Sequence, residues 1–158
     1  PYDPYNNDIL FDGQLGSLDF RDGKWNGIFY EEDEEKAKQQ GRKQNSGNLI
    51  VDFDLPKNKN VSEIAVSCME SINVGFILHP ESISLYDISS GSEKLISSIS
   101  IPKSDVDEPD SKKVFNLSLK QKNIKRVRLK INSNRSLPKG HVAEGQPAWV
   151  FVDEIFLL

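Results

Sequence analysis

The sequence has very little of the side chains from which covalent cross-links, zinc sites and membrane spans are built. Cys68 is the single cysteine among 158 residues, so no disulfide can form within the chain. The two histidines, His79 and His141, stand alone, and their spacing predicts no zinc site. No apolar run approaches the length of a membrane-spanning helix. We expect Cys68 to be an inert buried thiol, because it lies in an alternating apolar segment.

Motifs of catalysis are also missing from the sequence. No nucleophile motif, no phosphate-binding loop and no pair of carboxylates placed across a cleft can be recognised, so an enzyme is not indicated. The formal net charge is −4, with 20 basic residues spread among 24 acidic ones. This balance implies no basic surface overall and disfavours a nucleic-acid partner.

What the chain does contain is a series of short segments with strand character, separated by Ser-Gly, Pro-Lys and Asp-Glu-Pro-Asp turns. Val127, Leu129 and Ile131 give the clearest alternation, with basic residues on the outer face. We expect strands at 49–54, 61–71, 74–78, 82–88, 94–101, 114–119 and 124–131, and a last one at 149–158. With a length suited to one domain, this pattern predicts an all-β sandwich over residues 9–158. Residues 1–8 are interpreted as a linker or boundary.

The segment Glu31–Gln40 differs from the rest of the chain. It has good helix formers and acid-to-lysine spacings of four residues, but no apolar stripe. We interpret it as a solvated insertion, with a lid over a site as the alternative. The whole stretch to Asn48, with Arg42 in it, reads as an enlarged loop.

The closing run Trp149–Leu158 predicts a buried strand that is interrupted by two carboxylates, Asp153 and Glu154. Simple alternation puts Trp149, Phe151, Asp153 and Ile155 on one face and Glu154 on the other. Whichever face is buried carries a carboxylate among large hydrophobic side chains. Such a carboxylate needs a cation, an arginine or several hydrogen-bond donors as its partner.

An early glycine-rich segment offers such a partner. It contains the Asp-Gly turns at Asp12 and Asp22, which let a loop aim carbonyl and carboxylate oxygens inward. Oxygen ligands of this kind are those that calcium binds. A metal near Asp12 and Glu154 is one interpretation; in the other, Asp12 caps a turn and Glu154 pairs with a lysine or arginine.

These two ends of the chain resemble a known family. The early Asp-Gly turns with Gly16, Trp25 and Gly27, and the final Pro147–Ile155 motif, look like the discoidin-like domain of the coagulation factor type C family. More narrowly, the chain is similar to the C-terminal module of β-N-acetylhexosaminidases (chitobiases) of Bacteroidetes. The proline-led segment 77–86 and Gly140-His141 also fit this pattern.

The resemblance implies a jelly-roll of the galactose-binding type and a structural calcium ion held by Asp12 and Glu154. It implies no catalytic residue in this chain. The function expected from it is that of an accessory module of a periplasmic or extracellular bacterial glycosidase. The module would bind carbohydrate, N-acetylglucosamine oligomers first, or would pack on the catalytic domain of the same chain without binding sugar.

Sugars are held by aromatic faces and by polar groups that bond their hydroxyls. Candidates for these roles are Tyr30, His79, His141 and Trp25, together with Phe29, Asn73 and Trp149. Trp25 and Trp149 have apolar neighbours that favour core positions instead, and the alternative role for His79-Pro80 is to shape a turn. Tyr30 and His141 are the freest of the candidates, because both lie in loop context.

Overall fold

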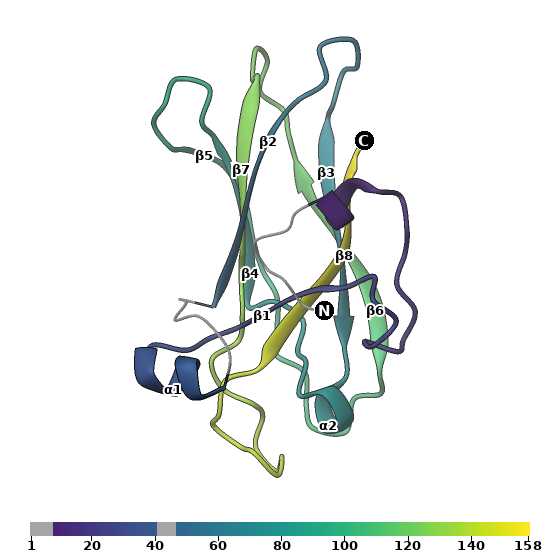
Figure 1. Cartoon of the computed structure of the whole chain (residues 1–158). Coiled ribbons are helices and arrows are strands. Elements are labelled where there is room, and N and C mark those ends of the chain that lie inside the picture. Colours follow the sequence, from purple (N-terminus) through teal and green to yellow (C-terminus); the bar gives the residue numbers. More distant parts are fainter. Residues whose placement is uncertain (1–7, 41–46) are drawn as a thin grey trace.

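The chain folds as a sandwich of two antiparallel four-stranded sheets, as the sequence predicts (Figure 1). The computed structural model describes residues 8–40 and 47–158. Arg42 and the first seven residues lie outside the described part. The first sheet has the strand order β1 (Asn26–Phe29), β8 (Trp149–Leu157), β3 (Glu63–Glu70) and β6 (Ser111–Ser118). The second has the order β2 (Asn48–Asp54), β7 (Arg126–Asn132), β4 (Ser82–Asp87) and β5 (Lys94–Ser100).

The main core lies between the two sheets and is built from the alternating positions of their strands. Ile64 and Val66 of β3 meet Val127, Leu129 and Ile131 of β7 in one buried cluster, which confirms the predicted core. Cys68 is fully buried in the same cluster. Burial, helped by the nearby charge of Asp153, raises the pKa of its thiol, so the thiol stays protonated.

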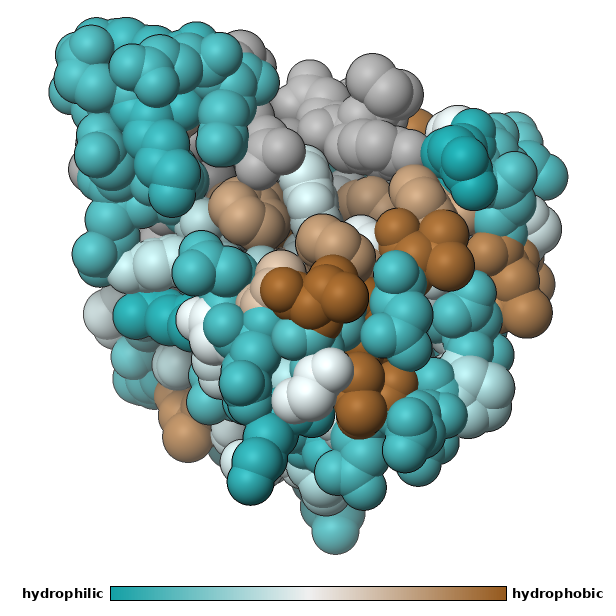
Figure 2. Space-filling view, turned by 90° about the horizontal axis from the view of Figure 1, so that it is seen from below, coloured by the Kyte–Doolittle hydropathy of each residue, from teal (hydrophilic) through white to brown (hydrophobic). Residues whose placement is uncertain are grey.

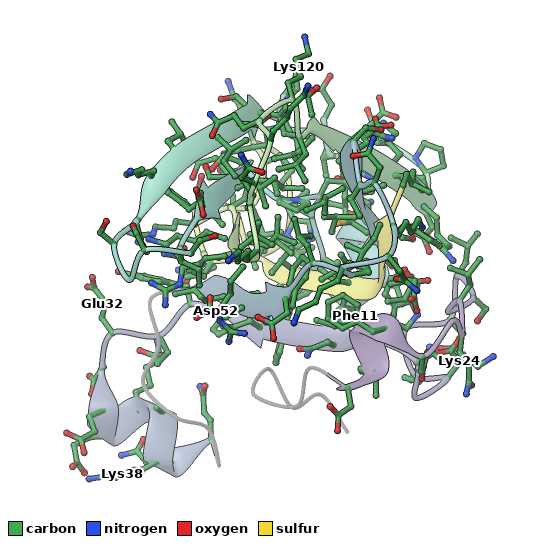
Figure 3. All side chains as sticks on the ribbon, turned by 90° about the horizontal axis from the view of Figure 1, so that it is seen from above. Phe11, Lys24, Glu32, Lys38, Asp52 and Lys120 are labelled. Carbon is green, nitrogen blue, oxygen red and sulfur yellow. The ribbon has the colours of Figure 1, made fainter. Side chains whose placement is uncertain are left out.

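Within residues 8–40 and 47–158, helical structure is confined to three short segments: η1 (Asp8–Phe11), α1 (Glu34–Gln39) and α2 (Ile72–Gly75). Asp33 caps α1 by accepting hydrogen bonds from the main-chain N–H groups of Glu35 and Lys36. Figure 3 shows α1 standing out from the body of the sandwich. Among the described residues, none of the helices is long and apolar enough to cross a membrane.

The strand predicted at Val74–Leu78 is wrong. Its first residues form the helical turn α2, and Phe76 follows in a left-handed conformation with φ of 56°. That backbone angle ends the turn and cannot be part of an extended strand. Only Ile77 makes bridges of the β type there, to Ser71 and to Trp149.

Strand β1 was not predicted. It is short, it contains a glycine, and it lies at the edge of the first sheet. Gly27 lies opposite Phe151 in β8, and a Cβ atom at Gly27 would overlap the Phe151 ring. Glycine is therefore required where the two strands meet, which is one of the uses of glycine within a sheet.

A β-bulge in β8 overturns the predicted alternation of the last strand. Glu154 pairs with Ser67 and Val152 pairs with Cys68, so Asp153 is an extra residue in β8. Ile155 consequently faces the main core together with Val152, and does not share a face with Phe151 as expected. A bulge re-aims side chains. Here it lets both neighbouring carboxylates contact the same N-terminal loop.

Candidate functional site

The clearest candidate for a binding site is a cleft of about 540 Å³ at the end of the sandwich that carries α1 and α2. Figure 2 views this end of the molecule and shows apolar side chains gathered among polar ones. We call this site the aromatic cleft, since its apolar walls are mainly rings. It is lined by Phe29, Tyr30, Glu31, Glu32, Asp33, Lys36, Gln40, Phe76, Gln146, Pro147 and Trp149.

The rings of the aromatic cleft continue into a buried row on the outer side of the first sheet. The Phe29 and Trp149 ring centroids lie 5.2 Å apart, and those of Trp149 and Phe151 lie 5.7 Å apart. Both pairs are tilted rather than stacked, at spacings typical of favourable aromatic contacts. Trp149 therefore packs between two other rings and lines the cleft with part of its surface exposed.

Tyr30 stands in a charged environment at the edge of this cleft. The guanidinium of Arg135 lies 4.3 Å from the centre of its ring. A hydrogen bond to Glu32, followed by desolvation, raises the pKa of the Tyr30 hydroxyl. The hydroxyl therefore stays protonated at neutral pH, while the ring packs against a cation.

The insertion with α1 supplies the polar wall. The Glu31 carboxylate is buried, accepts a hydrogen bond from the Asp33 N–H at 3.0 Å and lies 3.7 Å from the Lys36 ammonium. These contacts fix the start of α1 over the cleft. The insertion is thus not only solvated surface, because Asp33, Lys36 and Gln40 line the site.

His141 is buried beneath the cleft rather than exposed in a loop. Its ring meets the Phe76 ring edge-on at 4.8 Å. The Ala143 N–H donates to Nδ1, so Nε2 carries the proton and donates to the Ile72 carbonyl at 2.9 Å. His141 therefore joins the 137–146 loop to α2 and supports Phe76.

The remaining predicted ligand residues do not line the aromatic cleft. Trp25 is fully buried and donates to the Ser17 carbonyl from Nε1 at 3.2 Å. His79 is also buried, with Nε2 3.2 Å from the Ser111 hydroxyl. Asn73 bonds the Val106 carbonyl at 2.9 Å. Of the predicted residues, the structure brings Tyr30, Phe29 and Trp149 together.

Phe76 was missed in the sequence, because it lies within a segment that was read as a strand. It is 37% exposed, and it belongs to a group of exposed apolar side chains at this end that includes Val74 and Val142. Gly75 before it and the lack of alternation around it were the available signals of an exposed aromatic in a turn.

The carboxylates of the last strand hold the N-terminal loop in place. Asp153 is fully buried. Its carboxylate accepts a hydrogen bond from the Gly16 N–H at 2.8 Å and forms an ion pair with the Lys112 ammonium at 2.9 Å. The Lys112 ammonium also donates to the Gly16 carbonyl and lies 5.2 Å from the centre of the Trp25 ring. We call this arrangement of Lys112, Asp153 and Gly16 the lysine clamp.

Glu154 contacts the same loop at Gly13, three residues before the Gly16 that Asp153 contacts. Its carboxylate accepts a hydrogen bond from the Gly13 N–H at 3.1 Å. Burial raises the pKa of Glu154, the Gly13 bond opposes this, and the negative charges of Asp12 and Asp153 raise it further. Asp12 is thus near enough to Glu154 to act on its charge, while its own Oδ1 accepts from the Gln14 N–H.

The fit of these residues to a calcium ion is poor. In the described ranges, no three His, Cys, Asp or Glu side chains are grouped to hold a metal. Calcium takes six to eight oxygen ligands. One of the loop carbonyls expected to serve it, that of Gly16, already accepts from Lys112. We assign no role to a metal here, and the calcium site at Asp12 and Glu154 stays a prediction.

No protein-family model matches the chain, and none of the curated proteins compared with it matches in sequence.

Proposed function

We propose that this domain is a non-catalytic module of a secreted or periplasmic bacterial glycosidase of the chitobiase type, and that it binds carbohydrate in the aromatic cleft. The proposal rests on the discoidin-like sequence pattern and includes a jelly-roll of the galactose-binding type. N-acetylglucosamine and its short β-linked oligomers are the ligands proposed.

The observation that carries the proposal is the composition of the aromatic cleft. Phe76 and Trp149 provide apolar ring surface for the C–H-rich side of a sugar. Gln40, Gln146 and the carboxylate of Glu32 provide planar polar groups for its hydroxyls. These are the two kinds of surface that a sugar site combines, and they meet here at the end of a rigid sandwich.

The test is calorimetric titration of the whole domain with N-acetylglucosamine and its trimer. The Kd should be about millimolar, since a shallow site must offset the lost freedom of the ligand. Phe76→Ala should weaken binding about tenfold by removing stacking surface. Tyr30→Ala should also weaken it.

Phe11→Ala is the matched control for Phe76→Ala. Phe11 is 41% exposed and Phe76 is 37% exposed, and each makes one edge-on ring contact, Phe11 with Phe53. Phe11 does not line the aromatic cleft. Equal affinity of the two variants, or heat from no sugar at all, would refute the proposed site.

A second candidate function is supported by the exposed apolar residues at the same end. Val142 is 89% exposed and follows His141, whose ring contacts Phe76; Val74 is 69% exposed and lies two residues before Phe76. An apolar group of this kind is typical of a docking surface. In this alternative the domain packs on the catalytic domain of its own chain and binds no sugar. Deletion of the module would then lower the stability or activity of the parent enzyme while no sugar binds.

A further inference from the structure

A second cleft lies at the opposite end of the sandwich, where β2 ends and β3 begins. It has a volume of about 820 Å³ and lies between the segments 55–63 and 118–124. In Figure 1 these are the loops that join β2 to β3 and β6 to β7, at the end away from α1 and α2. We call it the lysine cleft.

The two loops are held side by side by their main chains. The Leu55 N–H donates to the Lys125 carbonyl at 2.8 Å, and the Leu119 N–H donates to the Ser62 carbonyl at 2.8 Å. Asn123 lies within the loop that joins β6 to β7, where its φ is 66°. The cleft is therefore fixed by the sandwich itself and does not need a ligand to form.

The charge of the lysine cleft is opposite to that of the chain as a whole. The two loops carry Lys57, Lys59, Lys120, Lys122 and Lys125, and no acidic residue occurs within 55–62 or 118–125. Glu63 is the single acidic residue among those that line the cleft. The whole chain has a net charge of −4, so these lysines form a local positive field that the overall composition hides.

The lysines of this cleft differ in their partners from the basic residues of β7. Lys59 donates from its ammonium to the Leu157 main-chain carbonyl. Arg126, Arg128 and Lys130 of β7 each pair with a carboxylate of a neighbouring segment. By contrast, the ion pairs found within residues 8–40 and 47–158 include neither Lys120 nor Lys122, and both are exposed. Figure 3 looks at this end of the molecule and shows Lys120 projecting from it.

The other lining residues indicate the kind of anion. Asn60, Gln121 and Asn123 bring amides, and Ser62 and Ser118 bring hydroxyls, all able to bond sugar hydroxyl groups. Neither an arginine nor an aromatic ring is found among the lining residues. Arginine forks and aromatic stacking are the usual means of holding phosphates and unpaired bases, so a nucleic acid fits this cleft less well than an acidic sugar does.

We propose that the lysine cleft is a second binding site, and that it takes an oligosaccharide bearing carboxylate or sulfate groups. Lysine ammonium groups neutralise the acidic groups as compact point charges, and the amides and hydroxyls bond the remaining ring hydroxyls. Binding should weaken as salt is added, because salt screens the attraction between the exposed lysine ammonium groups and the acidic groups of the sugar. The proposal is independent of sugar binding in the aromatic cleft.

The test is titration of the domain at low salt with trigalacturonate and with a sulfated heparin tetrasaccharide. We expect at least one of them to bind, and the Lys120→Gln/Lys122→Gln variant to lose about tenfold in affinity or more. Lys24→Gln/Lys139→Gln is the matched control, with the same loss of charge at exposed positions outside the cleft. It should bind like the unmodified domain.

Three further ligands complete the experiment. An N-acetylglucosamine trimer should not compete with the acidic sugar, and Phe76→Ala should leave acidic sugar binding unchanged. An oligonucleotide and anionic lipid vesicles should bind more weakly than the acidic sugars. The proposal is overturned if neither acidic sugar binds at low salt, if both double variants bind equally, or if the oligonucleotide or the vesicles bind best.

Discussion

The lysine clamp predicts that Lys112→Met strongly destabilises the domain. Asp153 has no exposed surface, and its Oδ1 atom has no hydrogen-bond partner among the described residues. Without Lys112, the Asp153 carboxylate would keep the Gly16 N–H as its partner. Removing one partner of a buried ion pair costs about 3–5 kcal/mol. The Lys112 side chain is 26% exposed, so the lower end, about 3 kcal/mol, is expected.

That loss corresponds to a fall of about 6–12 °C in the melting temperature of a domain of this size. Urea unfolding followed by circular dichroism measures the free energy directly. Lys113→Met, the same substitution at the next position of β6, is the control; Lys113 is exposed and should tolerate the change.

The double variant Lys112→Met/Asp153→Asn tests the interaction itself. It should cost clearly less than the sum of the two single variants, because it removes the unpaired charge that each leaves behind. Additive losses, to within about 0.5 kcal/mol, would show that the clamp is not a coupled pair. Addition of EGTA to the unmodified domain separates this clamp from the predicted calcium site, since loss of a bound ion would lower the melting temperature.

Three other changes test the local reasoning. Burial raises the pKa of Glu154 above its unfolded value near 4.5, so the folded state keeps the proton to a higher pH than the unfolded state does. The stability that this contributes is complete below the unfolded pKa and is lost as pH rises through the folded pKa. Glu154→Gln should therefore raise the melting temperature at pH 7, whereas a fall that occurs only with calcium present would indicate coordination. Burial lowers the pKa of His79, although Glu70 opposes this, so stability is complete above about pH 6.5 and is lost as pH falls through the folded pKa. His79→Gln should flatten that part of the urea-midpoint profile, and an unchanged slope would contradict the assignment. Gly27→Ala should cost about 1–3 kcal/mol through overlap with the Phe151 ring, and a loss below about 0.5 kcal/mol would mean that the strands adjust.

The sandwich could be predicted because its core strands keep strict alternation. In β7 the apolar residues Val127, Leu129 and Ile131 are buried, and they alternate with basic residues on the other face. This alternation is typical of an antiparallel sheet with one face in the core and one in solvent. The prediction was wrong where a single residue interrupts the regular conformation or pairing of the backbone. Phe76 adopts a left-handed angle, and the extra residue Asp153 depends on pairing with β3, so neither follows from local periodicity.

The candidate site could be predicted only in part. Tyr30, Phe29 and Trp149 were recognised as aromatic residues near loops, and they do meet in one cleft. The two histidines were harder to place, because a polar side chain in a loop can either face solvent or satisfy the loop's own main chain. His141 does the latter, through Ile72 and Ala143.

The position of the last strand has a consequence for how the chain folds during synthesis. β8 lies between β1 and β3, so the first strand of the chain has no partner in its sheet until the final strand arrives. Pairings this distant in sequence form slowly. The nascent chain therefore cannot close the first sheet while β8 is still within the ribosome. Until then β1 and one edge of β3 remain open to other strands, the situation in which edge-to-edge association between chains occurs.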